Sequence, residues 1–187
     1  AIIQDLRLAG HDAPLVLGYD SLEAYETDTH YFGAVVGRYA NRIRDGRFVL
    51  DGTRHSLDRN FLGKHMLHGG VDGFSRRPWT VALHGRDFVT LSLHDPAGAM
   101  GFPGALDVTC TYRLKIPGTL SVELTATADE PTVCNLTQHS YFNLDDGGRS
   151  GRHGRILSPL SALAAEKSRE PHQARGIAFE DQPWGIT

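Results

Sequence analysis

The clearest pattern in the chain is an alternation of apolar and polar side chains over residues 106–114, which returns over residues 120–128. The apolar positions are Leu106, Val108, Cys110, Tyr112 and Leu114 in the first run, and Leu120, Val122, Leu124, Ala126 and Ala128 in the second. Pro117-Gly118 supplies a turn between the runs. A period of two is typical of strands with one buried face, so these runs predict two long antiparallel strands.

Shorter segments predict further strands. Residues 47–57 are centred on Asp51-Gly52, the usual signal of a two-residue hairpin turn. The apolar runs at 79–83 and 88–93 predict a second pair of strands across a short polar turn. Residues 1–8 also predict a strand.

Signals for helices are few. Asp20 and Glu23 form a predicted capping pair for one short helix over residues 21–25, and residues 161–170 predict a second. In residues 33–43 the glycines favour an irregular, closely approached backbone over a helix. Strands joined by short turns, with almost no helix, predict an all-β fold, which would be an antiparallel β-sandwich or a barrel.

Length and charge narrow the functional classes. A chain of 187 residues is long enough for one ordinary domain. Its net charge of -3, with no basic block, gives no support to a nucleic-acid or membrane partner, and no apolar run is long enough to cross a bilayer. The two cysteines, Cys110 and Cys134, lack CxxC spacing and predict buried thiols rather than a disulfide. The chain begins at Ala1 in mid-pattern, so its true N-terminus is expected upstream.

Residues 135–144, Asn-Leu-Thr-Gln-His-Ser-Tyr-Phe-Asn-Leu, carry the densest candidate chemistry. His139 has a side chain that gives or takes a proton near neutral pH. Tyr141 offers flat apolar surface beside it, and Ser140 offers a hydroxyl that donates and accepts hydrogen bonds. This mixture favours a neutral, hydroxyl-rich ligand over a phosphate or a peptide. The alternative is a strand end with a buried histidine whose hydrogen bonds are satisfied.

Two other polar stretches lie within the β scaffold, where loops and strand ends commonly carry sites. Asn41-Arg42 supplies a guanidinium whose planar fork binds two adjacent oxygens, including vicinal sugar hydroxyls. The alternative for this arginine is a salt bridge. His68 is followed by Gly69 and Gly70, whose bare backbone permits close approach to a ligand. The alternative for His68 is a turn histidine.

Other chemistries have weaker support. His65 and His68 are three positions apart, but no nearby cysteine or carboxylate completes a zinc set, so no metal is expected. Ser140 lacks the Gly-x-Ser-x-Gly elbow of serine hydrolases. Residues 33–37 lack the strand, Gly-x-Gly-x-x-Gly and helix of a dinucleotide site.

The three polar stretches, with the motifs between them, resemble those of the aldose 1-epimerases, the galactose mutarotase family. In chain order the resembling motifs are Gly37-Arg38-Tyr39-Ala40-Asn41-Arg42-Ile43, Leu67-His68-Gly69-Gly70, Gly73-Phe74 with Trp79, Gly101-Phe102-Pro103-Gly104, Asn135-Leu136-Thr137 and His139-Ser140-Tyr141-Phe142-Asn143-Leu144. The order and spacing of the set also match the family, so the resemblance runs from residue 1 to about residue 144.

The resemblance implies a large antiparallel β-sandwich, called a supersandwich, with a sugar bound in an open cleft. It implies interconversion of the α and β anomers of a hexose such as galactose or glucose, in the cytoplasm, with neither cofactor nor metal. In the family mechanism a glutamate base removes the proton of the C1 hydroxyl, and a histidine acid protonates the ring oxygen. The matching residues are His139 as the acid, Asn41, Arg42 and His68 as sugar-binding residues, and Ser140 and Tyr141 beside the acid as further substrate-binding residues.

The end of the chain departs from the family pattern. The family's base glutamate lies well beyond the last motif, and the chain stops first. The late glutamates are Glu166, Glu170 and Glu180, and no pattern places any of them in the site. Residues 1–187 are therefore expected to be one partial galactose mutarotase-like domain, truncated or frame-shifted after about residue 144, with a divergent tail over 145–187. The alternatives are a sugar-binding relative without catalysis and an inactive fragment, while the preferred hexose and the oligomeric state stay open.

Overall fold

A four-stranded antiparallel sheet forms the centre of the fold. The structure, a computed structural model, describes residues 1–144 and the backbone of residues 164–167 and 174–177. The sheet has the order β6-β7-β8-β9, and its strands are β6 (Thr80–His84), β7 (Phe88–Asp95), β8 (Leu106–Lys115) and β9 (Thr119–Ala128). Its two longest strands, β8 and β9, are those that the alternation of side chains predicts, and β6 and β7 are the second predicted pair.

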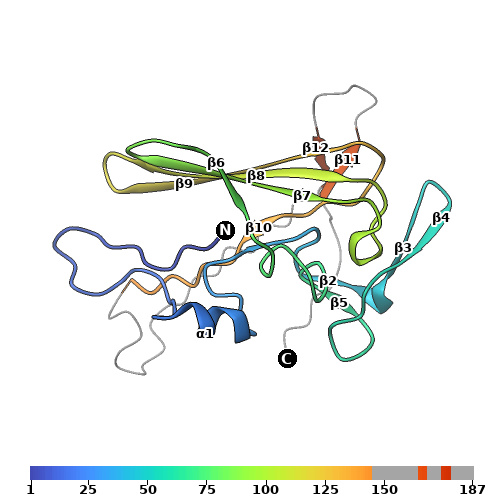
Figure 1. Ribbon diagram of the computed structural model, residues 1–187, viewed down its shortest axis with the longest axis horizontal. Coiled ribbons are helices and arrows are strands. Elements are labelled where there is room, and N and C mark those ends of the chain that lie inside the picture. The colour runs from blue at the N-terminus through green and yellow to red at the C-terminus, as the bar shows by residue number, and fades with distance from the viewer. Residues whose placement is uncertain (145–163, 168–173, 178–187) are drawn as a thin grey trace.

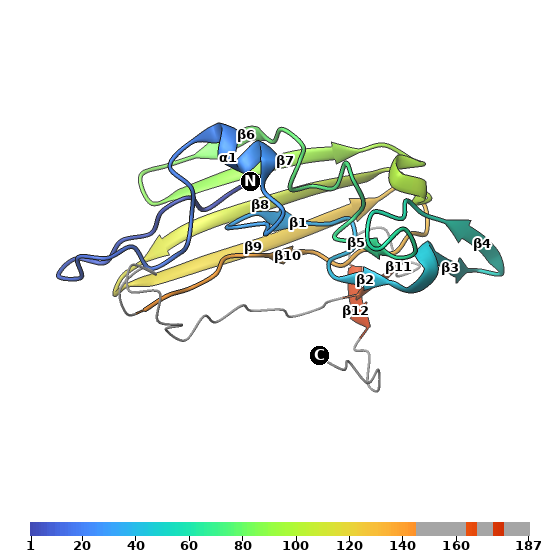
Figure 2. The same ribbon diagram turned by 90° about the horizontal axis from the view of Figure 1, so that it is seen from below.

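Shorter elements lie beside this sheet. They are α1 (Leu22–Thr27), β1 (Val35–Val36), β2 (Arg42–Ile43), the 3-10 turn η1 (Arg44–Gly46), β3 (Arg47–Leu50), β4 (Thr53–Ser56), β5 (Met66–Leu67), the 3-10 turn η2 (Ala99–Gly101), β10 (Thr137–Gln138), β11 (Ala164–Lys167) and β12 (Ala174–Ile177). Antiparallel pairs join β1 to β10, β2 to β5, β3 to β4 and β11 to β12. Figures 1 and 2 place β1, β10 and the β2–β5 pair on one side of the four-stranded sheet. These two layers confirm the predicted all-β antiparallel sandwich.

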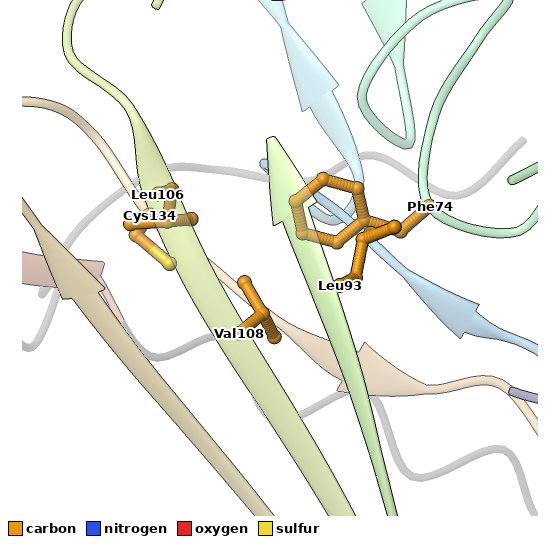
Figure 3. Packing of buried hydrophobic residues seen from close by; sticks show 5 residues of the cluster. All are labelled: Phe74, Leu93, Leu106, Val108 and Cys134. Carbon is orange, nitrogen blue, oxygen red and sulfur yellow. The ribbon is translucent and has the colours of Figure 1, made fainter. Parts of the chain in front are cut away.

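The core lies between the layers. Along β8 the side chains of Leu106, Val108 and Cys110 are buried, as their alternation predicts. Figure 3 shows one cluster, in which the Phe74 ring lies against Leu93 of β7, with Leu106, Val108 and Cys134 nearby. Both cysteines are free and buried, which confirms the predicted pair of thiols. Since these apolar groups leave water together, they supply the main force that holds the layers in contact.

The predicted hairpin is present as β3 and β4. Asp51 and Gly52 both have positive φ, at 47° and 79°, which is the backbone of the two-residue turn that twists as the strands do. No helix among the residues that the structure describes is both long enough and apolar enough to span a membrane.

Two predictions near the N-terminus are wrong. Residues 1–8 form no continuous strand. Ile2 makes only an isolated bridge with Ala34, and the segment that contains Ala34 turns at Gly33 (φ 65°). The helix is present as α1, but Ser21 caps it in place of the predicted Asp20 and Glu23 pair. Ser21 has the extended backbone of an N-cap, and its Oγ accepts a hydrogen bond from the Ala24 N–H at 3.3 Å.

The tail also differs from its prediction over the part that is described. Residues 164–167, predicted as helix, and 174–177, predicted as irregular, pair as β11 and β12. Backbone pairing between two segments outweighs the weak helix propensity of one of them. The rest of the predicted helix over 161–170 lies outside the described residues.

A buried ion pair ties the two layers together. Arg38, 1% exposed, follows β1 and reaches Asp95 at the end of β7, with Nη2 2.6 Å from Oδ2. The Arg38 guanidinium also donates to the carbonyl oxygens of Pro103 and Gly104. Arg77 contacts the second oxygen of Asp95 at 2.5 Å. The carboxylate therefore balances two arginines, and most donors of the buried guanidinium are satisfied.

We expect Asp95→Ala to lower the free energy of unfolding by about 3 to 5 kcal/mol, because it leaves a buried guanidinium unpaired. Urea unfolding followed by circular dichroism measures this loss. Asp107→Ala is the matched control, since Asp107 lies opposite His94 on the adjacent strand and pairs with that histidine, with 76% of the Asp107 side chain exposed. That control should cost less than about 1 kcal/mol. Equal losses in the two variants would contradict the anchoring role of Asp95.

Candidate active site

Two histidines from distant parts of the chain meet at the centre of the site. His68 follows β5 and His139 follows β10, and their ring centroids lie 5.1 Å apart with the planes at 85°. Both residues are 7% exposed. The backbone N–H of His139 donates to the Ala34 carbonyl at 2.7 Å, which fixes that segment against the chain just before β1. The predicted acid and the predicted sugar-binding histidine are therefore neighbours.

Two hydrogen bonds join Asn41 and His68, one between their backbones and one to the His68 ring. The His68 N–H donates to the Asn41 carbonyl at 3.0 Å, and the Asn41 N–H donates to His68 Nδ1, also at 3.0 Å. Both residues have positive φ, 66° for Asn41 and 51° for His68. Left-handed backbone is costly for residues other than glycine, and such strain gathers at functional sites. The pairing of β2 with β5 stabilises this geometry by placing the two segments side by side.

These contacts decide the protonation of His68. Because Nδ1 accepts a hydrogen bond from a backbone N–H, the proton of the neutral ring lies on Nε2. Burial, together with the smaller effects of the charges of His139 and Arg42, lowers the pKa of His68 from 6.5 to about 3. His68 is thus a fixed, neutral hydrogen-bond donor through Nε2 and is no general acid at neutral pH.

His139 is in a different electrostatic position. Burial leaves the pKa of His139 below its ordinary value, although a backbone hydrogen bond and the negative charge of Asp28 both act to raise it. His139 therefore combines a weakened hold on its proton with a nearby carboxylate that favours the protonated form. Of the two histidines, His139 is the one suited to proton transfer.

Asp28 is a structural carboxylate and is poorly placed to act as a base. Burial alone would raise its pKa, yet hydrogen bonds from the His30 N–H, the Tyr19 hydroxyl and the Phe32 N–H leave the pKa below its ordinary value. The three donors lie 2.7, 2.9 and 3.1 Å from the carboxylate oxygens. An acceptor already occupied in this way takes up a further proton reluctantly.

The other predicted site residues take distinct positions. Arg42 is exposed, lies over the Phe61 ring at 4.4 Å and donates to Asn41 Oδ1 at 3.1 Å. Tyr141 is partly buried, and its ring centroid is 5.1 Å from that of His139. Ser140 is 0% exposed, and its N–H donates to Gln138 Oε1 at 2.8 Å. Asn41, Arg42, His68, His139 and Tyr141 thus form a connected group, whereas the side chain of Ser140 lies in the interior.

Two residues near His68 in the sequence, His65 and Gly69, have structural roles in the surrounding backbone. His65, considered above with His68 as a metal ligand, accepts a hydrogen bond from the Asp45 N–H through Nδ1 at 3.0 Å. Gly69 is bare because a Cβ there would lie 1.8 Å from the Gly37 carbonyl oxygen. The close approach that this glycine permits is therefore to the chain's own backbone.

Three aromatic residues near the site were not predicted from the sequence. Tyr31 contacts both histidines, with ring centroids 4.6 Å from His68 and 5.8 Å from His139. Phe32 packs edge-on against Tyr141 at 5.0 Å, and Phe61 lies under Arg42. The only sequence signal was the aromatic pair directly before Gly33. The site is therefore rich in flat apolar surface and neutral donors, which suits a sugar-like ligand.

The fold and the site together define an antiparallel β-sandwich protein with a histidine pair suited to binding and proton transfer on a small neutral ligand. Comparison with known proteins gives the family. The sequence profile of the aldose 1-epimerase family matches residues 1–157, and the chain belongs to this family.

Individual relatives agree with this assignment. The chain is 45% identical over 125 residues to the aldose 1-epimerase of Haemophilus influenzae, covering 67% of this chain and 36% of the relative. It is 47% identical over 141 residues to the galactose mutarotase of Bos taurus, covering 74% of this chain and 40% of the relative. The chain thus spans about 40% of the length of the curated relatives that it matches.

Solved structures show the same fold. A galactose 1-epimerase from Lactobacillus acidophilus matches with a TM-score of 0.69 and 29% identity, covering 79% of this chain and 43% of that one. A GalM/aldose epimerase homologue from C. elegans matches with a TM-score of 0.68 and 26% identity, covering 91% of this chain and 65% of that one.

We expect His68 to stay neutral, with its proton on Nε2, between about pH 5 and pH 8. Nitrogen-15 NMR of the imidazole ring checks both the tautomer and the charge. The pKa of His68 is about 3 in the folded protein and has the ordinary value of 6.5 in the unfolded chain. The unfolded chain therefore binds more protons between pH 3 and pH 6.5. His68 therefore contributes stability above pH 6.5, and that contribution is lost as the pH falls toward 3. A His68 ring that titrates between about pH 5 and pH 8, or that carries its proton on Nδ1, would contradict the expected neutral Nε2–H form.

Proposed function

We propose that the protein is an aldose 1-epimerase, which interconverts the α and β anomers of a hexose such as galactose or glucose. The observation that carries the proposal is the contact between His68 and His139, with Arg42 and Asn41 beside them. One histidine is a fixed neutral donor and the other is suited to give a proton. Ring opening of a sugar needs both a group that binds hydroxyls and a group that protonates the ring oxygen.

Each residue has a proposed role in this reaction. His139 gives its proton to the ring oxygen, the bond from C1 to that oxygen breaks, and a base takes the proton of the C1 hydroxyl. Rotation about the C1–C2 bond and reclosure with the reverse proton transfers yield either anomer. His68 Nε2–H, Asn41 and the fork of Arg42 bind sugar hydroxyls, and Tyr141 supplies an apolar wall. These steps transfer protons and break and re-form one C–O bond without a change of oxidation state, so the proposed chemistry calls for no redox cofactor and no metal.

The base is proposed to come from outside residues 1–144. The carboxylate whose charge reaches His139 is Asp28, and its three hydrogen bonds make it a poor base. The side chains of Glu166, Glu170 and Glu180 lie outside the described residues. We propose that residues 1–187 form part of one galactose mutarotase-like domain, with a divergent tail over 145–187. A hexose is the proposed partner, and a cytoplasmic location is proposed because the two cysteines are unpaired thiols.

We expect the protein to accelerate the mutarotation of freshly dissolved α-D-galactose, and His139→Ala to lower kcat on the order of a hundredfold or more. Polarimetry measures both rates. His84→Ala, on the exposed edge strand β6, is the matched control and should keep the full rate. If the wild-type protein is folded and leaves the spontaneous rate unchanged, the proposed activity is wrong.

Arg42→Lys should weaken galactose binding about tenfold, or about 1.4 kcal/mol. Lysine keeps the charge but loses the planar fork and its stacking on Phe61. Saturation curves for galactose separate this effect on KM from any effect on kcat. Arg44→Lys is a matched control, because Arg44 is also exposed and lies just beyond β2. A normal KM in Arg42→Lys would show that the fork does not bind the sugar.

A further inference from the structure

We propose that Tyr31 is a positioning residue for the histidine pair, and that Asp28 and Arg76 hold Tyr31 in place. The inference rests on the proposed function, since it assigns how the two histidines keep the arrangement that acid catalysis needs. Tyr31 stands out because its ring contacts both rings of the pair, at 4.6 and 5.8 Å between centroids. His68 and His139 contact each other at 5.1 Å, so the three rings form a closed triangle.

The backbone at Tyr31 shows that this placement has a cost. Its φ is 61°, in the left-handed region that bulky residues avoid. Only surrounding contacts keep a residue in such a conformation, and strain of this kind gathers at functional sites. Asn41 and His68 share this strained backbone, at φ 66° and 51°. Three of the residues that line the site are therefore held in the same rare conformation.

The Asp28 carboxylate supplies the first set of contacts that keep Tyr31 in this conformation. Asp28 is 8% exposed, and it accepts hydrogen bonds from the backbone N–H groups of His30 and Phe32, which flank Tyr31. The Tyr19 hydroxyl donates to the same carboxylate at 2.9 Å. A single buried carboxylate thus closes the loop around Tyr31. Phe32, the next residue, packs on Tyr141 with the ring centroids 5.0 Å apart. Tyr31 and Phe32 therefore contact different residues of the same site.

Arg76 ties this loop to the segment that carries His68. Its guanidinium donates to the Glu26 carbonyl at 2.6 Å and to the Asp28 carbonyl. Arg76 lies shortly after His68 in the chain, on the Gly-rich stretch that also contains Gly70 and Gly73. The two segments therefore meet twice, once at the rings of Tyr31 and His68 and once at Arg76.

The chemistry of Tyr31 fits a positioning role. Burial raises the pKa of its hydroxyl above the ordinary value, and the charge of Asp28 adds to this against the opposing charge of Arg76. The hydroxyl is therefore neutral at working pH and neither gives nor takes a full proton. What the ring supplies is a rigid wall that limits rotation of two imidazoles, whose small displacement would slow proton transfer strongly.

The test compares Tyr31→Leu, which removes the ring, with Tyr31→Phe, which removes only the hydroxyl. We expect Tyr31→Leu to lower kcat by about ten- to a hundredfold with little change in KM. Tyr31→Phe, which keeps the ring, should retain most of the wild-type kcat. The proton resonances of the His68 and His139 rings should move in Tyr31→Leu and stay near their wild-type positions in Tyr31→Phe. These NMR spectra are recorded without sugar, so they test the positioning role even if the protein proves to have no epimerase activity.

Arg76→Gln is the second variant, because it leaves all three rings in place and removes only the link between their segments. It should shift the same two ring resonances and lower kcat several-fold, whereas Arg86→Gln, an exposed arginine in the turn between β6 and β7, should do neither. Unchanged histidine resonances in both Tyr31→Leu and Arg76→Gln would overturn the proposal. So would a Tyr31→Phe variant as impaired as Tyr31→Leu, since the hydroxyl would then be the acting group.

Discussion

The ion pair between Arg38 and Asp95 is the constraint on which the two layers of this sandwich depend. Asp95 ends a strand of the large sheet, and Arg38 lies between the two short strands of the opposite layer. A guanidinium buried this deeply is tolerated only while a carboxylate and several carbonyls satisfy it. The backbone of Arg38 extends the anchor, because its carbonyl accepts the Asn135 N–H at 2.9 Å and the Asn135 carbonyl accepts the Ala40 N–H at 2.7 Å. The segments that lead to Asn41 and to His139 are thus held at one point.

The geometry of the candidate active site depends on this anchor and on strained backbone. Apolar packing alone brings layers together without specifying the angle between two rings. Here Tyr31, Asn41 and His68 all have left-handed backbone. The Asn41 N–H donates to the His68 ring, and the N–H of Phe32, next to Tyr31, donates to Asp28. A reaction that moves protons on a small neutral ligand needs this kind of rigid placement, since hydrogen-bond geometry changes steeply with distance and angle.

Much of the fold could be predicted from the sequence because its signals are local. Alternation fixes which face of β8 is buried, and Asp51-Gly52 fixes a turn, whatever the rest of the chain does. The errors at residues 1–8 and 164–167 arose where pairing with another segment decided the outcome. An apolar run becomes a strand only where a partner segment lies beside it, and the segment that bridges to Ile2 turns at Gly33.

For the candidate site, the sequence by itself determined the residue types and the family, because the order and spacing of motifs can be recognised without knowing which residues are in contact. It also determined that His139 lies in a segment rich in hydroxyls, amides and aromatics. Only the tertiary structure decided that His68 stays neutral, since its low pKa comes from burial and from charges on other segments. The structure likewise placed Tyr31 against both histidines and Arg38 in the core. These features depend on contacts between residues far apart in the sequence, and such contacts form only when the two layers pack together.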